Sequence, residues 1–209
     1  MDIQSFADEW YREDSMIMAA RTRGEHLTDG NVSPATGGLL RSIAAALNAA
    51  AVVQAGGDGG VSSLYLLAGM ADAGVLTAIE YAPGPDQVAR DVFRDAGVGH
   101  RVRPITGKTL DVISRLADHA YDLVVVGAEV TDRAEHLAQA RRLLRPGGAV
   151  IFLGVFGREQ CVLDPSRRDE QTSAQRHFLT EAGDDPSITA SLIPIDNGVL
   201  VVFIPLDEG

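Results

Sequence analysis

Residues 52–80 read VVQAGGDGGVSSLYLLAGMADAGVLTAIE, and this stretch decides the fold class. An apolar run at 52–55 ends in a glycine cluster, a helical pattern follows, and a second apolar run ends at Glu80. The clustered glycines are Gly56, Gly57, Gly59 and Gly60. A strand, a glycine turn and a helix bring backbone close to a nucleoside-bearing ligand, and an acid ending the next strand accepts hydrogen bonds from ribose hydroxyls. The stretch therefore predicts a nucleoside-cofactor site in a βαβ unit.

Outward from this stretch, apolar runs alternate with helical patterns along most of the chain. Strands are expected at residues 51–55, 75–80, 102–106, 122–127 and 149–155. This spacing predicts a parallel α/β sheet with helices on both faces. The continuously apolar run within 122–126 is typical of a strand buried on both faces. Asp196-Asn197-Gly198 lies between two further apolar runs, which predicts a C-terminal antiparallel hairpin.

Residues 1–32 differ from the rest, because a charged helical pattern carries Trp10 and several methionines and then ends in a polar loop. We expect an N-terminal helical extension over 1–32 and one cofactor-binding domain over 33–209. Ser33 suits the cap of the next helix and Pro34 its first position. The extension has the composition of a substrate lid or of an oligomer contact.

Charge and cysteine content limit the possible partners. The 209 residues include 18 Lys and Arg against 29 Asp and Glu, a net charge of −11. Nucleic acids and anionic membranes attract positive charge, so we expect neither as a partner. The single Cys161 cannot form an intrachain disulfide, residues 1–15 lack a leader pattern, and no apolar stretch approaches a bilayer-spanning length. The sequence thus favours a cytoplasmic protein.

The loop at 56–60 has three interpretations. An ordinary turn is one, since glycine clusters often punctuate α/β chains, but Glu80 argues against it. A dinucleotide site is another, although G-x-G-x-x-S at 57–62 only approximates the required pattern and Asp58 would repel a pyrophosphate. S-adenosylmethionine fits best, because Gln54 and Asp58 suit its ammonium group and Glu80 suits its ribose.

From Val32 to the C-terminus the chain resembles the catechol/caffeoyl-CoA-type O-methyltransferases, especially an actinobacterial branch. The resemblance covers about four-fifths of the length, in order: VSPATGGLL (32–40), VVQAGGDGGVSSLYLL (52–67), LTAIE (76–80), DVFRDAGVGHRVRPITG (91–107), YDLVVVGAE (121–129) and RLLRPGGAVIFLG (142–154). It implies a Rossmann-like class I methyltransferase fold, with seven mostly parallel strands in the order 3-2-1-4-5-7-6. It also implies a small hydroxylated methyl acceptor and a homodimer to which the N-terminal helix contributes.

The loop chemistry and the resemblance together predict a set of donor-binding residues. They are Val32, Ser33, Gln54, Gly56, Gly57, Asp58, Gly59, Ser62, Glu80, Tyr81, Gly107, Lys108, Thr109, Ala128 and Glu129. In this set, Glu80 and Tyr81 would hold the ribose and the adenine edge. Gln54 departs from the family pattern, which has an acid there, and Lys108 stands where an acidic or small residue is usual.

The metal-dependent members of the family hold a divalent ion through an aspartate after the fourth strand and an Asp-Asn pair after the fifth. In this sequence these positions are Gly127 and Leu153-Gly154, and the family's catalytic lysine falls at Val130. Hard cations require oxygen ligands that these residues lack. We therefore expect no bound metal and a metal-independent methyl transfer.

The catalytic base is the least determined part of the prediction. Glu129 and Asp132 are the nearby acids, and either suits general-base work on an acceptor hydroxyl. A helix cap formed by Thr131 or Asp132 is the stronger interpretation of this turn. His26 and His136 are weaker candidates. The lost metal ligands keep an alternative open, in which a noncatalytic methyltransferase fold binds the donor or its product as a sensor or scaffold.

Overall fold

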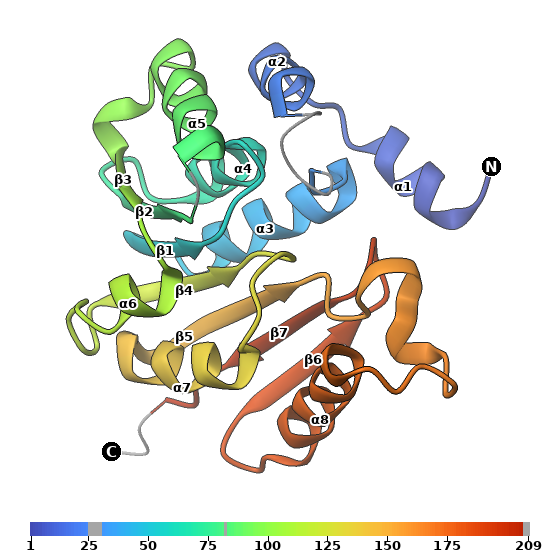
Figure 1. Ribbon diagram of the computed structural model, residues 1–209. Coiled ribbons are helices and arrows are strands. Elements are labelled where there is room, and N and C mark those ends of the chain that lie inside the picture. Colours follow the sequence, from blue (N-terminus) through green and yellow to red (C-terminus); the bar gives the residue numbers. More distant parts are fainter. Residues whose placement is uncertain (25–30, 82, 207–209) are drawn as a thin grey trace.

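The apolar runs form one seven-stranded sheet in the computed structural model (Figure 1), which describes residues 1–24, 31–81 and 83–206. The strands are β1 (Ala51–Ala55), β2 (Val75–Glu80), β3 (Val102–Thr106), β4 (Tyr121–Val126), β5 (Leu144–Leu153), β6 (Thr189–Ile193) and β7 (Val199–Phe203). Their order is β3-β2-β1-β4-β5-β7-β6. The first five strands run parallel, and β7 is antiparallel to both β5 and β6. The predicted order and the predicted hairpin are both confirmed.

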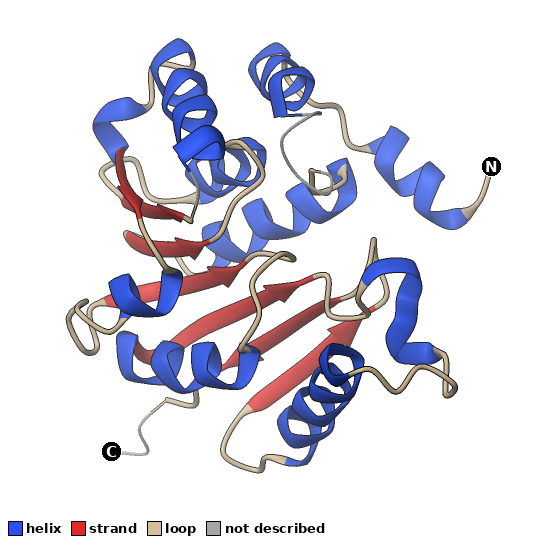
Figure 2. Ribbon diagram, in the orientation of Figure 1, coloured by secondary structure: helices blue, strands red, loops and turns tan. Residues whose placement is uncertain are grey.

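Helices cover both faces of the sheet (Figure 2). They are α1 (Ile3–Trp10), α2 (Ser15–Gly24), α3 (Pro34–Ala46), α4 (Val61–Gly69), α5 (Pro83–Asp95), α6 (Thr109–Ile113), α7 (Arg133–Leu143) and α8 (Glu170–Asp184), with 3-10 turns at Gly99–Arg101 and Arg158–Leu163. One apolar cluster joins the sheet to α2, α3, α4 and α5, and a second joins the opposite face to α6, α7 and α8. The sheet is therefore the middle of three layers.

Alternate side chains of each central strand belong to the two clusters. In β4, Leu123 and Val125 face α3 and α4, whereas Val124 and Val126 face α6 and α7. Neighbouring side chains of a strand point to opposite faces, so burial on both sides demands an unbroken apolar run. The predicted two-faced burial of this strand is confirmed.

The start of β5 differs from the prediction. We expect the strand at 149–155 after a break at 146–148, but α7 ends at Leu143 and β5 begins at once with Leu144. Tyr121 pairs with Leu144 and Leu123 pairs with Ala149, so the register shifts between these two pairs. The glycine-rich segment is accommodated as an irregularity inside the strand rather than as a loop before it.

The N-terminal part of the chain is helical, as predicted. α2 buries Ile17 and Ala20 against the core, while no residue of α1, which the structure describes in full, is buried. The α3 cap is also as predicted, because Ser33 Oγ accepts a 3.2 Å hydrogen bond from Thr36 N–H and Pro34 is the first helical residue. Within the described part of the chain, none of the helices combines the length and apolar character that crossing a bilayer requires.

Candidate active site

The strand order changes direction between β1 and β4, and their carboxyl ends lie side by side. The N–H of Gly127, after β4, donates to the carbonyl of Ala55 at 2.9 Å, and the N–H of Gly56, after β1, donates to Ile79 at 2.9 Å. Ligands of open α/β sheets bind in the crevice at such a switch point. The glycine loop predicted from the sequence lies at this crevice.

Three glycines leave room at the crevice for two carboxylates. A Cβ added to Gly56 would overlap Glu129 Oε1, and one added to Gly57 would overlap Glu80 Oε1. A Cβ on Gly127 would lie 2.7 Å from Glu129 Oε2. Gly56 also has φ of +76°, a conformation that residues with a side chain rarely adopt. Two carboxylates thus lie directly against a floor of glycine backbone.

Asp58 organises the glycine loop. Its Oδ1 accepts from the N–H and the hydroxyl of Ser62 at 2.9 and 2.8 Å, which caps the start of α4. Its Oδ2 accepts from the N–H of Val32 at 3.2 Å, so the loop is joined to the segment before α3. Only 7% of Asp58 is exposed. Its carboxylate therefore fixes the loop and also brings negative charge to the crevice.

Gln54 lies beneath this loop and supports it. Its amide donates to Ser62 Oγ at 2.7 Å and accepts from the Ser63 hydroxyl at 2.7 Å. The side chain is buried. The sequence predicts that Gln54 contacts the ammonium of a donor, and in the structure its amide bonds to the two serines at the start of α4. An amide suffices for this bridging role where the family pattern has an acid.

Glu80 ends β2 with its carboxylate against Gly57 and only 7% of the residue exposed. Burial, followed by repulsion from Glu129, Asp58 and Asp86, raises the pKa of Glu80 to about 8. A buried acid without a cationic partner is costly, so this arrangement is expected where a ligand supplies the compensating hydrogen bonds.

Glu129 extends back from the loop after β4, over Gly127 and Gly56. The residue as a whole is exposed, but its carboxylate is turned toward the glycine floor, and the partial removal of this carboxylate from water raises its pKa to about 7. Asp58 adds to this rise. Arg133 opposes the rise. The Arg133 guanidinium is itself buried and donates to the carbonyl of Ala128 at 3.1 Å, while its Nη1 has no partner among the described residues.

A buried histidine joins the loops after β3 and β4. Thr109 Oγ1 lies 2.8 Å from His136 Nε2, and His136 Nδ1 lies 3.0 Å from the carbonyl of Asp132. Burial lowers the pKa of His136, which favours the neutral ring. Because Nδ1 of the neutral ring donates to the carbonyl of Asp132, Nε2 accepts from the Thr109 hydroxyl. His136 therefore positions Thr109, which the sequence predicts to contact the methyl donor. The sequence gives no sign of this long-range link.

Asp132 occupies the cap position of α7 with φ of 53°, but its side chain makes no cap hydrogen bond to the described residues. The predicted side-chain cap is therefore wrong in detail. The left-handed backbone turns the carboxylate toward the Thr131 hydroxyl, at 3.2 Å, and the backbone carbonyl receives the His136 N–H. His26 lies outside the described residues.

The other predicted donor contacts border the same crevice or its rim. Ser33 N–H donates to Asp196 Oδ2 at 3.0 Å, which joins the α3 cap to the C-terminal hairpin. Gly107 N–H donates to the carbonyl of Glu80 at 2.9 Å. The exposed members of the set are Tyr81, Lys108, Ala128 and Glu129. Gly59 has φ of +74° and completes the turn into α4.

The crevice does not fit a divalent metal. The four positions at which related enzymes place ligands and lysine are Gly127, Val130, Leu153 and Gly154, whose side chains offer no oxygen or nitrogen. No group of three His, Cys, Asp or Glu that suits a metal ion occurs among residues 1–24, 31–81 and 83–206. Asp58, Glu80 and Glu129 lie around the glycine floor, but they do not form a group that could hold a metal ion, and a hard cation needs about six oxygen ligands.

Sequence relatives and solved structures agree with this fold. A relative from Mycobacterium sp. (strain JLS), described provisionally as an O-methyltransferase, is 38% identical over 202 residues, which span 95% of this chain and 90% of the relative. The cofactor-bound structure of Rv0187 from MTB is 27% identical, with a TM-score of 0.86 and coverage of 99% of this chain and 97% of that one.

A third similar protein is the O-methyltransferase TomG from Streptomyces achromogenes, which is involved in tomaymycin synthesis and was solved in complex with SAM. It is 25% identical with a TM-score of 0.84, and the match covers 98% of this chain and all 100% of TomG. The model of the O-methyltransferase family matches residues 10–203. With the strand order and the crevice above, these findings show that the chain belongs to the O-methyltransferase family, a family of S-adenosylmethionine-dependent enzymes.

Proposed function

We propose that this chain transfers the methyl group of S-adenosylmethionine to a hydroxyl of a small molecule, without a divalent metal. The observation that carries the proposal is the buried Glu80 carboxylate facing the glycine floor at the β1–β4 switch point. A ribose diol satisfies such a carboxylate with two charge-assisted hydrogen bonds.

Different residues around the crevice suit the ribose, the middle and the methionine end of the donor. Glu80 would hold the ribose, and the backbone of Gly56 and Gly57 would approach the middle of the molecule. The methionine end would lie toward Asp58, whose negative charge suits an ammonium and whose loop is joined to Val32. The other proposed contacts are Ser33, Gln54, Gly59 and Ser62 for the methionine end, Tyr81, Gly107, Lys108 and Thr109 for the adenosine end, and Ala128 and Glu129 for the adenine and the methyl group.

When bound, S-adenosylmethionine supplies a sulfonium methyl, which forms a bond to the acceptor oxygen as its bond to sulfur breaks and sulfur keeps the electron pair. The chain then has to orient the acceptor and accept its hydroxyl proton. Glu129 Oε1 suits this role, because the carboxylate lies at the glycine floor with a pKa near 7. Asp132 is less suited, since its carboxylate lies with Thr131 at the rim.

A direct assay tests the proposal. Purified protein, S-adenosylmethionine and a panel of catechols, phenols and hydroxylated acids are incubated with EDTA, and S-adenosylhomocysteine is measured by mass spectrometry. Acceptor-dependent product that is absent in Glu80→Ala supports the proposal. Donor binding without transfer to any acceptor would favour the noncatalytic sensor or scaffold, and turnover that requires added Mg²⁺ would overturn the metal-independent mechanism.

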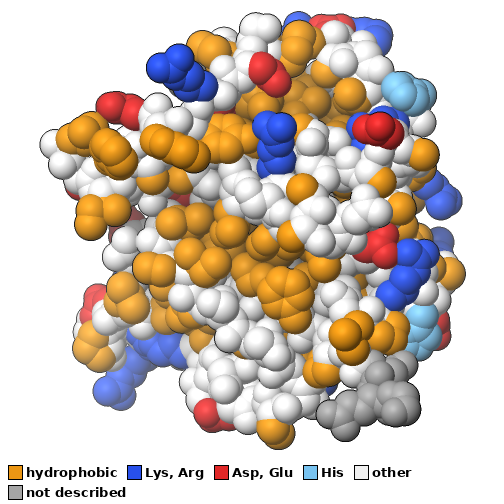
Figure 3. All heavy atoms as spheres, turned by 180° about the vertical axis from the view of Figure 1, so that it is seen from behind, with side chains coloured by type: hydrophobic (Ala, Val, Ile, Leu, Met, Phe, Trp, Pro, Cys, Tyr) orange, Lys and Arg blue, Asp and Glu red, His pale blue; other side chains and the backbone are white. Residues whose placement is uncertain are grey.

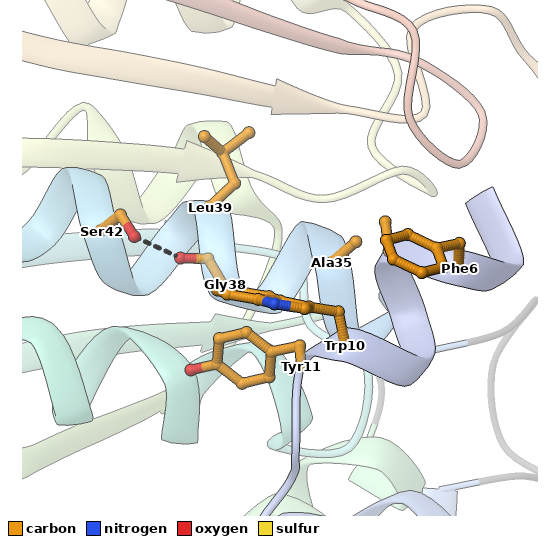
Figure 4. A pocket seen from close by; sticks show the side chains of 8 residues that line it. Phe6, Trp10, Tyr11, Ala35, Gly38, Leu39 and Ser42 are labelled. Atoms are coloured by element: carbon orange, nitrogen blue, oxygen red, sulfur yellow. Dashed lines mark hydrogen bonds between the residues drawn. The ribbon is translucent and has the colours of Figure 1, made fainter. Parts of the chain in front are cut away.

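The N-terminal helix supports a proposal of a homodimer. α1 presents Ile3 and Trp10, 90% and 76% exposed, and an apolar groove of about 450 Å³ lies between α1 and α3 (Figure 4). The groove is lined by Phe6, Ala7, Trp10, Tyr11, Ala35, Gly38, Leu39 and Ser42. Viewed from behind Figure 1, apolar side chains also gather near the middle of the molecule (Figure 3). Large exposed apolar surfaces are usually covered by a partner.

Light scattering on the intact chain tests the dimer. We expect the mass of two chains for the wild type and of one chain for Trp10→Asp, whereas Leu163→Asp, at another exposed apolar residue, should stay dimeric. A monomeric wild type with raised KM in Trp10→Asp would instead identify α1 as a substrate lid. The single Cys161, which cannot form an intrachain disulfide, supports a cytoplasmic location. We also propose an N-terminal helical extension over 1–32 and a donor-binding domain over 33–209.

A further inference from the structure

Three carboxylates lie around the glycine floor. Glu80 lies against Gly57, and Asp58 follows Gly57 in the chain. The Glu129 carboxylate lies over Gly56, in the space beside Gly127 that a side chain there would fill. Nothing in the sequence spacing predicts that residue 129 returns its carboxylate to this position.

This placement matters if the donor binds as proposed above. With the ribose at Glu80 and the backbone of Gly56 and Gly57 at the middle of the molecule, the sulfur would lie near Gly56, beside the Glu129 carboxylate. S-adenosylmethionine and its product S-adenosylhomocysteine differ only at this sulfur, by one methyl group and one positive charge. A carboxylate at this point therefore interacts with the one feature that separates substrate from product.

We propose that Glu129 recognises the charge of the donor's sulfonium and makes the site prefer S-adenosylmethionine over S-adenosylhomocysteine. The inference rests on the proposed function. The Glu129 carboxylate is ionised beside the cationic donor, and it takes up the acceptor's hydroxyl proton as the sulfur loses its charge. The neutral product then faces a neutral side chain, so the electrostatic attraction that holds the donor is absent when the product leaves.

The charges around Glu129 support this exchange. Asp58 from the loop after β1 and Glu80 from β2 both repel its negative form, and Arg133 from α7 favours that form. Asp86 from α5 adds repulsion at Glu80. Because these acids outnumber Arg133 and Lys108, the cations named among the described residues of the crevice, a ligand with one positive charge gains more in this crevice than a neutral ligand of the same shape.

Calorimetry with both ligands tests the inference. Dissociation constants for S-adenosylmethionine and S-adenosylhomocysteine are measured at pH 7.5 for the wild type and for Glu129→Gln, which keeps the shape and removes the charge. We expect the preference for the donor to fall by about tenfold in Glu129→Gln, the effect of one nearby opposite charge. The affinity for S-adenosylhomocysteine should change little.

Proton release gives a second readout. The raised pKa of Glu129 leaves part of its carboxylates protonated near pH 7. Titrations in phosphate and in Tris, which differ in ionisation enthalpy, should show more protons released by the donor than by the product in the wild type. This difference should shrink in Glu129→Gln. Any proton that the donor's own amino group releases on binding should still be released in this variant.

Two further variants separate charge from structure. Glu135→Gln on α7 removes an exposed charge that bonds to Gln139 at 3.2 Å, and it should leave the preference unchanged. Glu129→Ala with Gly127→Asp returns a carboxylate to the same space from the neighbouring position, because the heavy atoms nearest a Cβ on Gly127 all belong to Glu129. This double variant should recover most of the donor preference that Glu129→Ala loses.

The outcomes distinguish this inference from the proposed function. If neither ligand binds to the wild type, the proposed function fails. If both bind, and Glu129→Gln leaves both their ratio and the proton release unchanged, the proposed function stands and the role of Glu129 is overturned.

Discussion

The hydroxyl of Tyr65 in α4 donates a 2.6 Å hydrogen bond to Oε1 of Glu13, which lies 52 residues earlier in the chain. Glu13 also forms an ion pair with Arg21, and Arg21 donates to the carbonyl of Val32 at 2.7 Å. Burial and the Glu13 charge raise the pKa of Tyr65, so the phenol stays a donor at every physiological pH. The N-terminal segment is thereby joined to the loop that binds Asp58.

Tyr65→Phe should destabilise the protein by about 1.5–3 kcal/mol, because the carboxylate of Glu13 loses a charge-assisted hydrogen bond in a largely buried place. Urea unfolding measures the change. Tyr121→Phe is the matched control, since no hydrogen bond of that hydroxyl occurs within the described residues and the change should be near zero. An equal loss of stability in both variants would contradict the importance of the Glu13 contact.

Gly57→Ala should weaken donor binding by about tenfold or more, because the added Cβ would displace the Glu80 carboxylate from the ribose position. Stability should change by less than about 1 kcal/mol, since the displaced atom ends a flexible side chain. The control is Gly183→Ala in α8, where no described heavy atom lies within 4 Å and the helix should gain about 0.5–1 kcal/mol. Unaltered donor affinity in Gly57→Ala, measured by calorimetry, would refute this placement of Glu80.

The unliganded protein should lose stability as pH rises because of Glu80. Its pKa is raised from 4.5 to about 8 on folding, so its contribution is fully present below pH 4.5 and is lost as pH rises toward 8. Glu80→Gln cannot ionise, and its melting temperature should exceed that of the wild type by a few degrees at pH 8.5 but much less at pH 6. Parallel pH profiles for the two proteins would rule out the raised pKa.

Chelation should leave donor affinity and turnover unchanged. The expectation follows from Gly127, Val130, Leu153 and Gly154, which provide none of the oxygen ligands that a divalent ion requires. Activity is compared before and after dialysis against EDTA, and again after Mg²⁺ is added. Loss on dialysis with recovery on adding Mg²⁺ would be the contrary result.

Local sequence patterns predict most of the fold. The glycine cluster between two apolar runs, the unbroken run of β4 and Asn197-Gly198 each report on contacts only a few residues away, and the structure confirms the elements they predict. The start of β5 is the exception, because the strand extends back to Leu144 across Pro146 and two glycines, which ordinarily end a strand, and its register with β4 shifts there.

The site is less predictable, because its geometry depends on distant parts of the chain. The sequence places Glu80 and the glycine loop at neighbouring strand ends, which follows from the topology of a βαβ unit. It does not predict that Glu129 reaches back over Gly56, or that His136 bonds to Thr109 across 27 residues. Such contacts depend on loop paths that no local pattern specifies, and the assignment of donor contacts residue by residue remains a prediction.

Titration calorimetry of S-adenosylmethionine into the wild type and into Glu80→Ala tests the central claim most directly. The account predicts saturable binding by the wild type and affinity weakened roughly 10- to 100-fold in Glu80→Ala, since the ribose loses hydrogen bonds worth about 1.5–3 kcal/mol. No binding at millimolar donor, or equal affinity in the two proteins, would contradict it.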